Sequence, residues 1–307
     1  MILVTGGTGF IGKVLIRQLV ELGRPVRTLL RPSSYSPNLP RGIPVEAAVC
    51  SLRDERGLLA AMKDVDVIFH LAGGERLGAR SDLTTVDVEG TQAIARAAVQ
   101  AGVERMFYVS HLGADRASAY AVLKAKAIAE GHIVNSGIPY TIFRSAAVFG
   151  MGDRFTVPLA RMLHRAPGVF FLPAGGETRI QPIWVEDLVT CMVLAMDDPG
   201  TGNQLIEVGG EDYFTFRQVI EIIQAKIHTR RSLIPLSPAY LRILSLFIEQ
   251  SFPEFPISIF WLDYLAADRT CALDTLPRRF GLLPARFAQR LDYLQQPFNY
   301  PYQKRGK

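Results

Sequence analysis

The first twelve residues constrain the fold of this chain more than any other stretch. A short apolar run at 2–4 has the composition of a buried parallel strand, and it is followed at once by Gly6, Gly7, Gly9 and Gly12. Apolar residues then recur at helical spacing until Gly23 ends the pattern. This succession of strand, glycine turn and helix predicts a dinucleotide site, because the glycines let a pyrophosphate approach the backbone and the free N–H groups of the helix start.

The end of the second predicted strand, 25–30, indicates which dinucleotide is bound. An NAD site commonly has Asp or Glu there, about 20 residues after the glycines, to accept a hydrogen bond from the ribose 2′-OH. This chain has Arg31 instead, and Lys13 adds a cation beside the last glycine. A guanidinium binds a 2′-phosphate through two parallel hydrogen bonds, so the sequence favours NADP(H) over NAD(H). The alternative is that Arg31 is a solvated surface residue.

Strand and helix patterns alternate up to about residue 150. The predicted strands are 2–4, 26–30, 45–48, 65–70, 105–110 and 140–143, and the predicted helices are 12–22, 55–62, 85–101 and 117–136. Such alternation is typical of an α/β fold with a doubly wound parallel sheet. We therefore predict a dinucleotide-binding Rossmann domain over residues 1–150, with its ligand at the carboxyl ends of the strands.

The pattern changes after residue 150. It predicts helices over 155–164, 185–196 and 215–228, with Thr215 as a cap, and short strands over 170–172, 181–185 and 203–208. We predict that residues 151–307 form a smaller C-terminal cap lobe that also contributes to the edge of the Rossmann sheet.

The composition excludes several classes of protein. The three cysteines, Cys50, Cys191 and Cys271, have neither metal-ligand spacing nor a disulfide framework, so we expect a reducing compartment and no metal. No uninterrupted apolar stretch reaches about 18 residues, and the first strand begins at Ile2, so we expect neither a membrane span nor a signal peptide. The net charge of +5 is mild, and we expect a cytoplasmic protein without a nucleic-acid partner.

Several motifs together resemble the extended and atypical short-chain dehydrogenase/reductase superfamily, which includes the NAD-dependent epimerase/dehydratase and NmrA-like proteins. They occur in the expected order at 5–12, 64–73, 88–91, 101–110, 149–153 and 181–188. The C-terminal third is similar, more loosely, to the dehydrogenase-like accessory subunit of respiratory complex I and its bacterial relatives. That similarity rests on 215–228, 233–237 and 280–282.

The resemblance implies a cofactor-binding role for ten residues. The pyrophosphate would contact Gly6, Gly9, Phe10, Ile11 and Gly12, the 2′-phosphate Arg31, the adenine Leu52, and the nicotinamide ribose Leu71, Ala72 and Gly73. Two positions depart from the family pattern. Ser51 replaces the acid that usually precedes Leu52, and Asp87 stands where Asn is common.

The resemblance leaves two assignments open for the catalytic lysine. Reductases of this superfamily use a Tyr as general acid and a Lys four residues later on the same helix face. Tyr120 and Lys124 have this spacing, and Ser110 ends the preceding strand as a third partner. The pattern Lys-Ala-x-Ala-Glu instead matches 126–130, which makes Lys126 the ribose lysine and places Val122, which has no proton to donate, at the tyrosine position.

Two functions therefore remain open, and the sequence does not decide whether the chain is an enzyme. In the first, the cofactor is structural or sensory and the protein has a binding or assembly role linked to electron-transport complexes. In the second, the protein is an NADP-dependent reductase or epimerase acting on a small hydrophobic carbonyl or a nucleotide-sugar-like substrate. The apolar region 240–261 predicts either a helix pair packed on the cap or a surface for a partner subunit or a membrane. If this region is a surface for a partner subunit or a membrane, the protein would lie at the periphery of a membrane complex.

Overall fold

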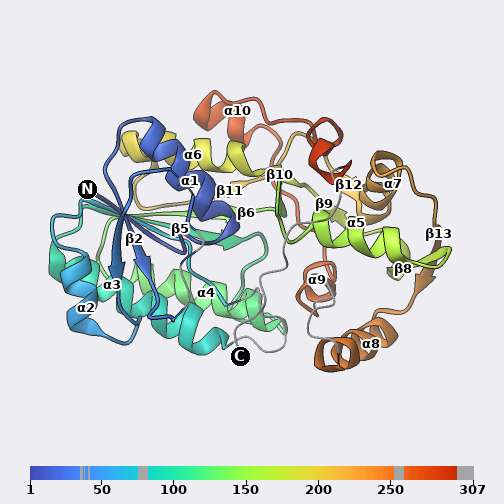
Figure 1. Ribbon diagram of the computed structural model, residues 1–307, viewed down its shortest axis with the longest axis horizontal. Helices are drawn as coiled ribbons and strands as arrows, with labels where there is room; N and C mark the ends of the chain where they lie inside the picture. The colour runs from blue at the N-terminus through green and yellow to red at the C-terminus, as the bar shows by residue number, and fades with distance from the viewer. Residues whose placement is uncertain (35–36, 38, 41, 75–81, 252–258, 296–307) are drawn as a thin grey trace.

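A seven-stranded parallel sheet is the centre of the fold (Figure 1). The computed structural model describes residues 1–34, 37, 39, 40, 42–74, 82–251 and 259–295. In spatial order the strands are β3 (Glu46–Val49), β2 (Val26–Leu30), β1 (Ile2–Thr5), β4 (Val67–His70), β5 (Arg105–His111), β6 (Tyr140–Ser145) and β11 (Gln204–Val208). The strand order reverses between β1 and β4, which is where ligands of open α/β sheets bind. The predicted doubly wound α/β fold is confirmed.

Helices cover both faces of this sheet (Figure 1). One face carries α1 (Phe10–Glu21), α6 (Val185–Asp197) and α10 (Thr275–Phe280), and the other carries α2 (Glu55–Ala61), α3 (Gly90–Ala101) and α4 (Ala121–Val134). Side chains alternate between the faces along each strand. On β1, for example, Val4 packs under α1 and α6 while Leu3 packs over α2 and α3.

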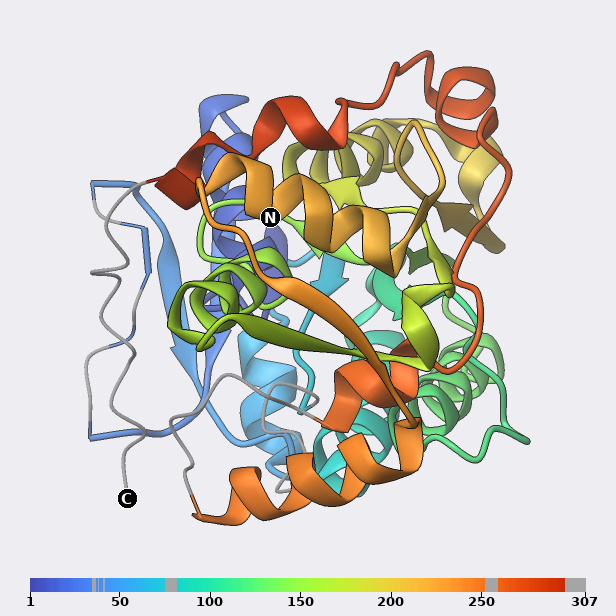
Figure 2. The same cartoon turned by 90° about the vertical axis from the view of Figure 1, so that its right-hand side faces the viewer.

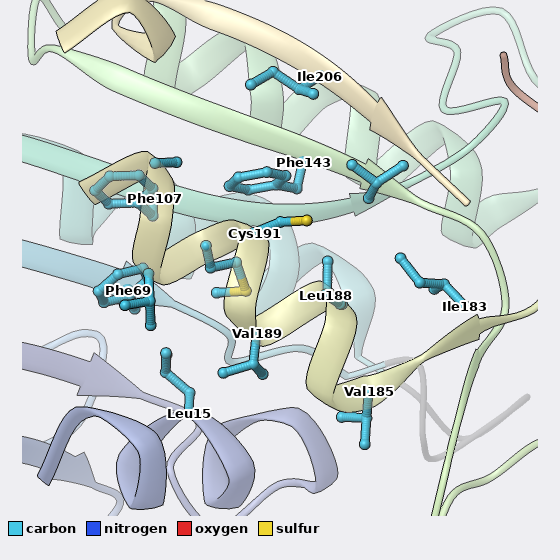
Figure 3. Close-up of a cluster of buried hydrophobic side chains, with 14 of the residues drawn as sticks. Leu15, Phe69, Phe107, Phe143, Ile183, Val185, Leu188, Val189, Cys191 and Ile206 are labelled. Atoms are coloured by element: carbon cyan, nitrogen blue, oxygen red, sulfur yellow. The ribbon is translucent and has the colours of Figure 1, made fainter. Parts of the chain in front are cut away.

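The hydrophobic core under α6 joins the two halves of the chain. Three stacked aromatic positions on neighbouring strands, Phe69, Phe107 and Phe143, face the helix, which inserts Val189 and Cys191 between them and α1 (Figure 3). The rings of Phe69 and Phe107 are 4.7 Å apart. Because α6 and the edge strand β11 follow residue 150 in sequence, the second half of the chain completes the sheet layer that the first half begins.

The remaining elements form a separate lobe beyond the carboxyl ends of the strands (Figures 1 and 2). It contains α5 (Thr156–Arg165), α7 (Phe216–Lys226), α8 (Pro238–Ser251), α9 (Ile259–Tyr264) and the strand pairs β8 (Val169–Pro173) with β13 (Ser232–Leu236), β9 (Arg179–Ile180) with β12 (Phe214–Thr215), and β7 (Val148–Phe149) with β10 (Ile183–Trp184). This lobe has its own hydrophobic core, which α5, α7 and the α9 residue Tyr264 share.

A buried carboxylate fixes the entrance to this lobe. Asp153 is 4% exposed and accepts hydrogen bonds from the backbone N–H groups of residues 150, 155 and 157 at 2.9, 2.9 and 3.0 Å. The hydroxyls of Thr156 and Tyr293 donate to the same side chain at 2.5 and 3.1 Å. Burial raises the pKa of Asp153, and these hydrogen bonds oppose that rise. The network joins the start of α5 to the C-terminal segment.

The structure corrects several predicted boundaries. The helix predicted over 85–101 begins as a π-helical turn, Thr84–Glu89, before α3. The helix predicted over 117–136 starts only at Ala121, because residues 115–119 form turns held by Asp115 and Ser118. The strand predicted over 181–185 is reduced to Ile183–Trp184. The predicted Thr215 cap is confirmed as a capping box with Gln218.

The apolar region 240–261 contains the two helices α8 and α9, which pack on each other. An ion pair joins Arg242 on α8 to Asp263 on α9. Tyr240 and Ile243 are each 68% exposed, so part of α8 is turned away from the lobe. Three apolar residues assigned to this region from the sequence, Phe252, Phe255 and Ile257, lie outside the described residues.

Candidate cofactor site

The glycine turn after β1 has the geometry of a phosphate cradle. Gly6 has a φ of +73°, and a Cβ there would lie 2.6 Å from the carbonyl group of Leu71. A Cβ on Gly12 would overlap the carbonyl oxygen of Gly6, so only glycine lets the start of α1 approach the turn this closely. The backbone N–H of Gly9 donates to the Gly6 carbonyl at 2.8 Å and closes the turn. These residues therefore fit a pyrophosphate.

The N-terminus of α1 is open to an anion. Gly9 is the cap residue and supplies no side-chain hydrogen bond, and no acidic residue lies in the first turn. The backbone N–H groups of Phe10, Ile11 and Gly12 are consequently without intrahelical acceptors at the positive end of the helix dipole. A negatively charged pyrophosphate would satisfy them.

The loop after β4 lies directly beside this turn. Its residues Leu71, Ala72 and Gly73 are half-buried, and the Ala72 N–H donates to Thr5 Oγ1 at 3.3 Å. Behind the loop, His70 lies with Nδ1 2.7 Å from Thr5 Oγ1 and Nε2 3.0 Å from Thr91 Oγ1. Complete burial, assisted by the charge of Lys126, lowers the pKa of His70 to about 3. His70 is therefore a neutral residue that joins two strands and α3, and it is not an acid–base group.

The residues assigned to the adenosine half lie at the ends of β2 and β3. Arg31 follows β2 directly, and its side chain is exposed and makes no ion pair with any described residue. Lys13 is half-buried on α1, and burial lowers its pKa. Leu52 is half-buried against the start of α3, where a Cβ on Gly90 would lie 2.6 Å from Leu52 Cδ1. Two cations and one apolar side chain thus lie in the region assigned to the adenosine half of the cofactor.

A buried ion pair lies at the nicotinamide end of the site. Lys126 Nζ is 3.4 Å from Asp87 Oδ1, and the two side chains are 6% and 1% exposed. The Gly74 N–H donates to Asp87 Oδ2 at 2.8 Å, and the lysine ammonium lies 5.2 Å from the centre of the Tyr108 ring. A Cβ on Gly73 would lie 3.1 Å from Asp87 Oδ1 and 3.4 Å from Lys126 Nζ. The ammonium is thus held beside the loop assigned to the nicotinamide ribose.

The alternative lysine and its tyrosine have a different environment. Tyr120 is the cap residue of α4 and half-buried, whereas Lys124 is exposed on the first turn of that helix. Val122, one helical turn before Lys126, is half-buried. Ser110 at the end of β5 is completely buried, and its hydroxyl has no hydrogen-bond partner among the described residues. The structure therefore brings Lys126, and not Lys124, to the inner wall of the site.

The sequence pattern of the NmrA-like family matches residues 1–254, which is most of the chain. The chain belongs to the NmrA-like family. The match confirms the predicted superfamily and implies that the protein binds a nicotinamide dinucleotide, either NAD or NADP.

Curated relatives of this NmrA-like protein include a complex I subunit and an enzyme. The chain is 32% identical over 229 residues to the mitochondrial NADH dehydrogenase [ubiquinone] 1 alpha subcomplex subunit 9 of Arabidopsis thaliana. The aligned region covers 72% of this chain and 56% of the plant protein. The chain thus spans little more than half the length of that relative. It is 30% identical over 221 residues to the ceramide reductase of Caulobacter vibrioides, covering 72% of this chain and 68% of the reductase.

Solved structures of related fold support the architecture. The NADPH complex of the quinone oxidoreductase QOR2 from Escherichia coli superimposes with a TM-score of 0.73 and 19% identity, covering 96% of this chain and 99% of that one. At this identity the similarity shows the fold alone. Among the described residues of the NmrA-like protein, the helices are all too short or too polar to cross a bilayer.

Sequence reasoning missed Asp87 as the partner of Lys126. The departure from the usual Asn at this position was visible, and it was the one signal that could have indicated an ion pair. An acid replacing an amide at a buried position needs a nearby cation, and the family pattern that identifies Lys126 would have supplied it.

Proposed function

We propose that this NmrA-like protein binds NADP(H) as a structural or sensory cofactor and has a binding or assembly role linked to an electron-transport complex. The observation that carries the proposal is the pairing of Lys126 with Asp87 at the nicotinamide end of the site, with Val122 one turn earlier. A lysine in this position orients the ribose, but valine has no proton to give to a substrate. The site therefore supports cofactor binding without the general acid of the reductases.

The preference for NADP(H) rests on charge at the end of β2. Arg31 is exposed and has no carboxylate partner among the described side chains, so its guanidinium is available for the 2′-phosphate. Lys13 adds positive charge from α1. A carboxylate at this place, as in an NAD site, would repel the phosphate instead.

Arg31→Ala is expected to weaken NADPH binding by about 10- to 100-fold, because a charge-assisted hydrogen bond contributes about 1.5–3 kcal/mol. NADH has no 2′-phosphate, so its affinity should be unchanged. Isothermal titration with both cofactors measures the two effects on the same preparation. Equal losses for NADPH and NADH would contradict the assignment of Arg31 to the 2′-phosphate.

The assembly role rests on the relationship to the complex I subunit and on the surface of α8. The exposed side chains of Tyr240 and Ile243 are apolar surface that a partner subunit would cover. The curated plant relative is named as a subunit of the NADH dehydrogenase complex. We therefore propose that this protein acts at the periphery of a membrane complex, through the region 240–261.

The proposed function predicts NADPH binding without catalytic turnover. Purified protein should bind NADPH tightly and fail to oxidise it with a panel of quinones and long-chain ketones, and Tyr120→Phe should change neither result. In cells that lack the chain, the amount of assembled NADH dehydrogenase complex should fall, and the wild-type protein should restore it. Turnover that Tyr120→Phe abolishes would instead establish a reductase with Tyr120 as its acid.

The second candidate is an NADP-dependent reductase or epimerase of a small hydrophobic carbonyl compound or a nucleotide-sugar-like substrate. It is favoured by Ser110, whose buried hydroxyl has no hydrogen-bond partner among the described residues and could donate to a carbonyl oxygen. The relative named as a ceramide reductase is consistent with a reductase activity. In this function a bound cofactor would supply the hydride, Ser110 would polarise the carbonyl, Tyr120 would give the proton and Lys124 would orient the ribose. Loss of turnover in Ser110→Ala, with NADPH binding intact, is the result that would favour this candidate.

A further inference from the structure

The side chain of Arg269 is largely buried, and its Nε atom has no hydrogen-bond partner among the described residues. The residue is 7% exposed, and its Nε atom is completely buried. Within the part of the chain that the structure describes, no hydrogen bond and no ion pair joins this guanidinium to another residue. Its position is nevertheless fixed, because the Arg269 backbone N–H donates to the carbonyl of Arg179 at 2.8 Å. The charge is held in place, and among the described groups Tyr264, Tyr120 and Asp268 act on it through space without a hydrogen bond.

The groups around this guanidinium come from both parts of the molecule. On the cap side its carbon Cζ lies 5.6 Å from the centre of the Tyr264 ring on α9. On the sheet side it lies against Gly113, just after β5, where a Cβ would overlap Nη1. Gly113 has a φ of +77°, so both its conformation and the space beside it require glycine. Arg269 therefore lies at the junction of the cap lobe and the carboxyl end of β5.

The same junction is lined by aromatic side chains. His111 at the end of β5 lies 5.5 Å from the ring of Phe260 and 6.2 Å from that of Tyr264. Trp261 lies 5.4 Å from Tyr264, and both Phe260 and Trp261 are half-buried. Partly exposed rings beside an unpaired cation suit a ligand that carries an anionic group on an apolar body.

The energetics of burial indicate that the arginine is retained for binding. Removing a charge from water without a partner costs several kcal/mol, and arginine cannot escape this cost by losing its proton near neutral pH. Tyr264 offers only a ring face, which stabilises a cation far less than a carboxylate does. A residue of this kind lowers the stability of the free protein, as binding residues commonly do.

We propose that Arg269 binds the oxyanion group, a carboxylate or a phosphate, of a ligand whose apolar part contacts the aromatic side chains of α9. The planar guanidinium accepts either anion in a two-pronged arrangement. This site lies on the cap side of β5, apart from Arg31 and Lys13, and it stands independently of which function is assigned to the cofactor.

The stability of two arginine variants separates a binding role from a structural one. Arg105 is a matched comparison, because its half-buried guanidinium donates to Thr141 and Thr201 and to the carbonyls of residues 195 and 198. Arg105→Met should lower the melting temperature by several degrees, since it removes all of these hydrogen bonds. Arg269→Met keeps the apolar stem and removes an uncompensated charge, so its melting temperature should be unchanged or higher. A loss as large as that of Arg105→Met would overturn the proposal.

The ligand class is tested by titrating the full-length protein, without cofactor, with octanoate, octyl phosphate and octanol while recording tryptophan fluorescence. At least one anion should bind at least about tenfold more tightly than octanol, and Arg269→Met should remove this difference. The anion with the higher affinity identifies a carboxylate or a phosphate ligand. The proposal would be overturned if both anions bound no more tightly than octanol. It would also be overturned if the preference for the anion survived in Arg269→Met.

Gly113→Ala gives a second variant, in which Arg269 itself is not substituted. Its methyl group would displace the guanidinium, so the preference for the anion should fall as it does in Arg269→Met. NADPH affinity should remain that of the wild type in Arg269→Met, which distinguishes this site from the cofactor site. If NADPH affinity falls in Arg269→Met in parallel with the affinity for octanoate or octyl phosphate, this substitution acts on the cofactor site and the proposal is overturned.

Discussion

Lys126→Met is expected to weaken NADPH binding by at least about 100-fold, whereas Lys124→Met should leave it unchanged. Lys126 is buried beside the loop at Gly73, and the proposed function has its ammonium donate to the nicotinamide ribose. Charge-assisted hydrogen bonds in a dry site are worth about 1.5–3 kcal/mol each, and more than one is lost with the ammonium. Lys124 is exposed on the same helix and is therefore the matched control.

The same substitution should also destabilise the protein. Lys126→Met leaves the carboxylate of Asp87 buried without its ammonium partner, which costs about 3–5 kcal/mol in comparable buried pairs. The double variant Asp87→Asn/Lys126→Met removes both charges and should recover most of this free energy of unfolding, but not NADPH affinity. Urea unfolding followed by circular dichroism measures the first effect and calorimetric titration the second. Normal NADPH affinity in the folded double variant would show that Lys126 does not bind the cofactor.

Asp153→Ala is expected to lower the free energy of unfolding by about 3–5 kcal/mol. Three backbone N–H groups and the hydroxyls of Thr156 and Tyr293 lose their acceptor, and each buried unsatisfied donor costs about 1 kcal/mol or more. The effect should be chiefly on stability, because none of the hydrogen bonds that are lost involves a residue assigned to the cofactor.

Tyr293→Phe is the control for this network. It removes one hydroxyl and leaves the Asp153 carboxylate with its other four donors, so its cost should be about 1 kcal/mol. Equilibrium denaturation of both variants, with NADPH affinity as a second measurement, checks the prediction. If Asp153→Ala cost no more than Tyr293→Phe, the carboxylate would not be the centre of the network.

The glycine turn and the residues at the strand ends could be predicted because their signals are local. Gly6, Gly9 and Gly12 lie within one short stretch, and a strand pattern and a helix pattern adjoin them directly. Arg31 could be located because it follows a predicted strand at a distance that the fold fixes. Periodicity likewise predicted the strands of the sheet and the capped helix α7, because each pattern describes how one segment meets a core.

Local patterns did not predict the contact of Asp87 with Lys126 or that of Arg269 with Gly113, because each contact joins distant segments of the chain. Asp87 lies in a π-helical turn and Lys126 in α4, and only the packing of these two elements places the carboxylate beside the ammonium. Arg269 and Gly113 are brought together by the docking of the cap onto the sheet. Local patterns also placed the start of α4 too early, since side-chain hydrogen bonds of Asp115 and Ser118 compete with the helix there.

The late position of β11 in the chain has a consequence for the protein as it is made. During synthesis β6 emerges before the whole of α5, α6 and the strands β8, β9 and β10 between them, and its outer edge has no partner until residues 204–208 follow. An unpaired central strand with an uncovered apolar face is prone to pair with other chains. A nascent protein stalled near residue 150 would therefore expose both the edge of β6 and the phenylalanine face that α6 later covers. Chaperones bind exposed strand edges and apolar faces of this kind. We therefore expect the nascent chain to need such protection until its second half has left the ribosome.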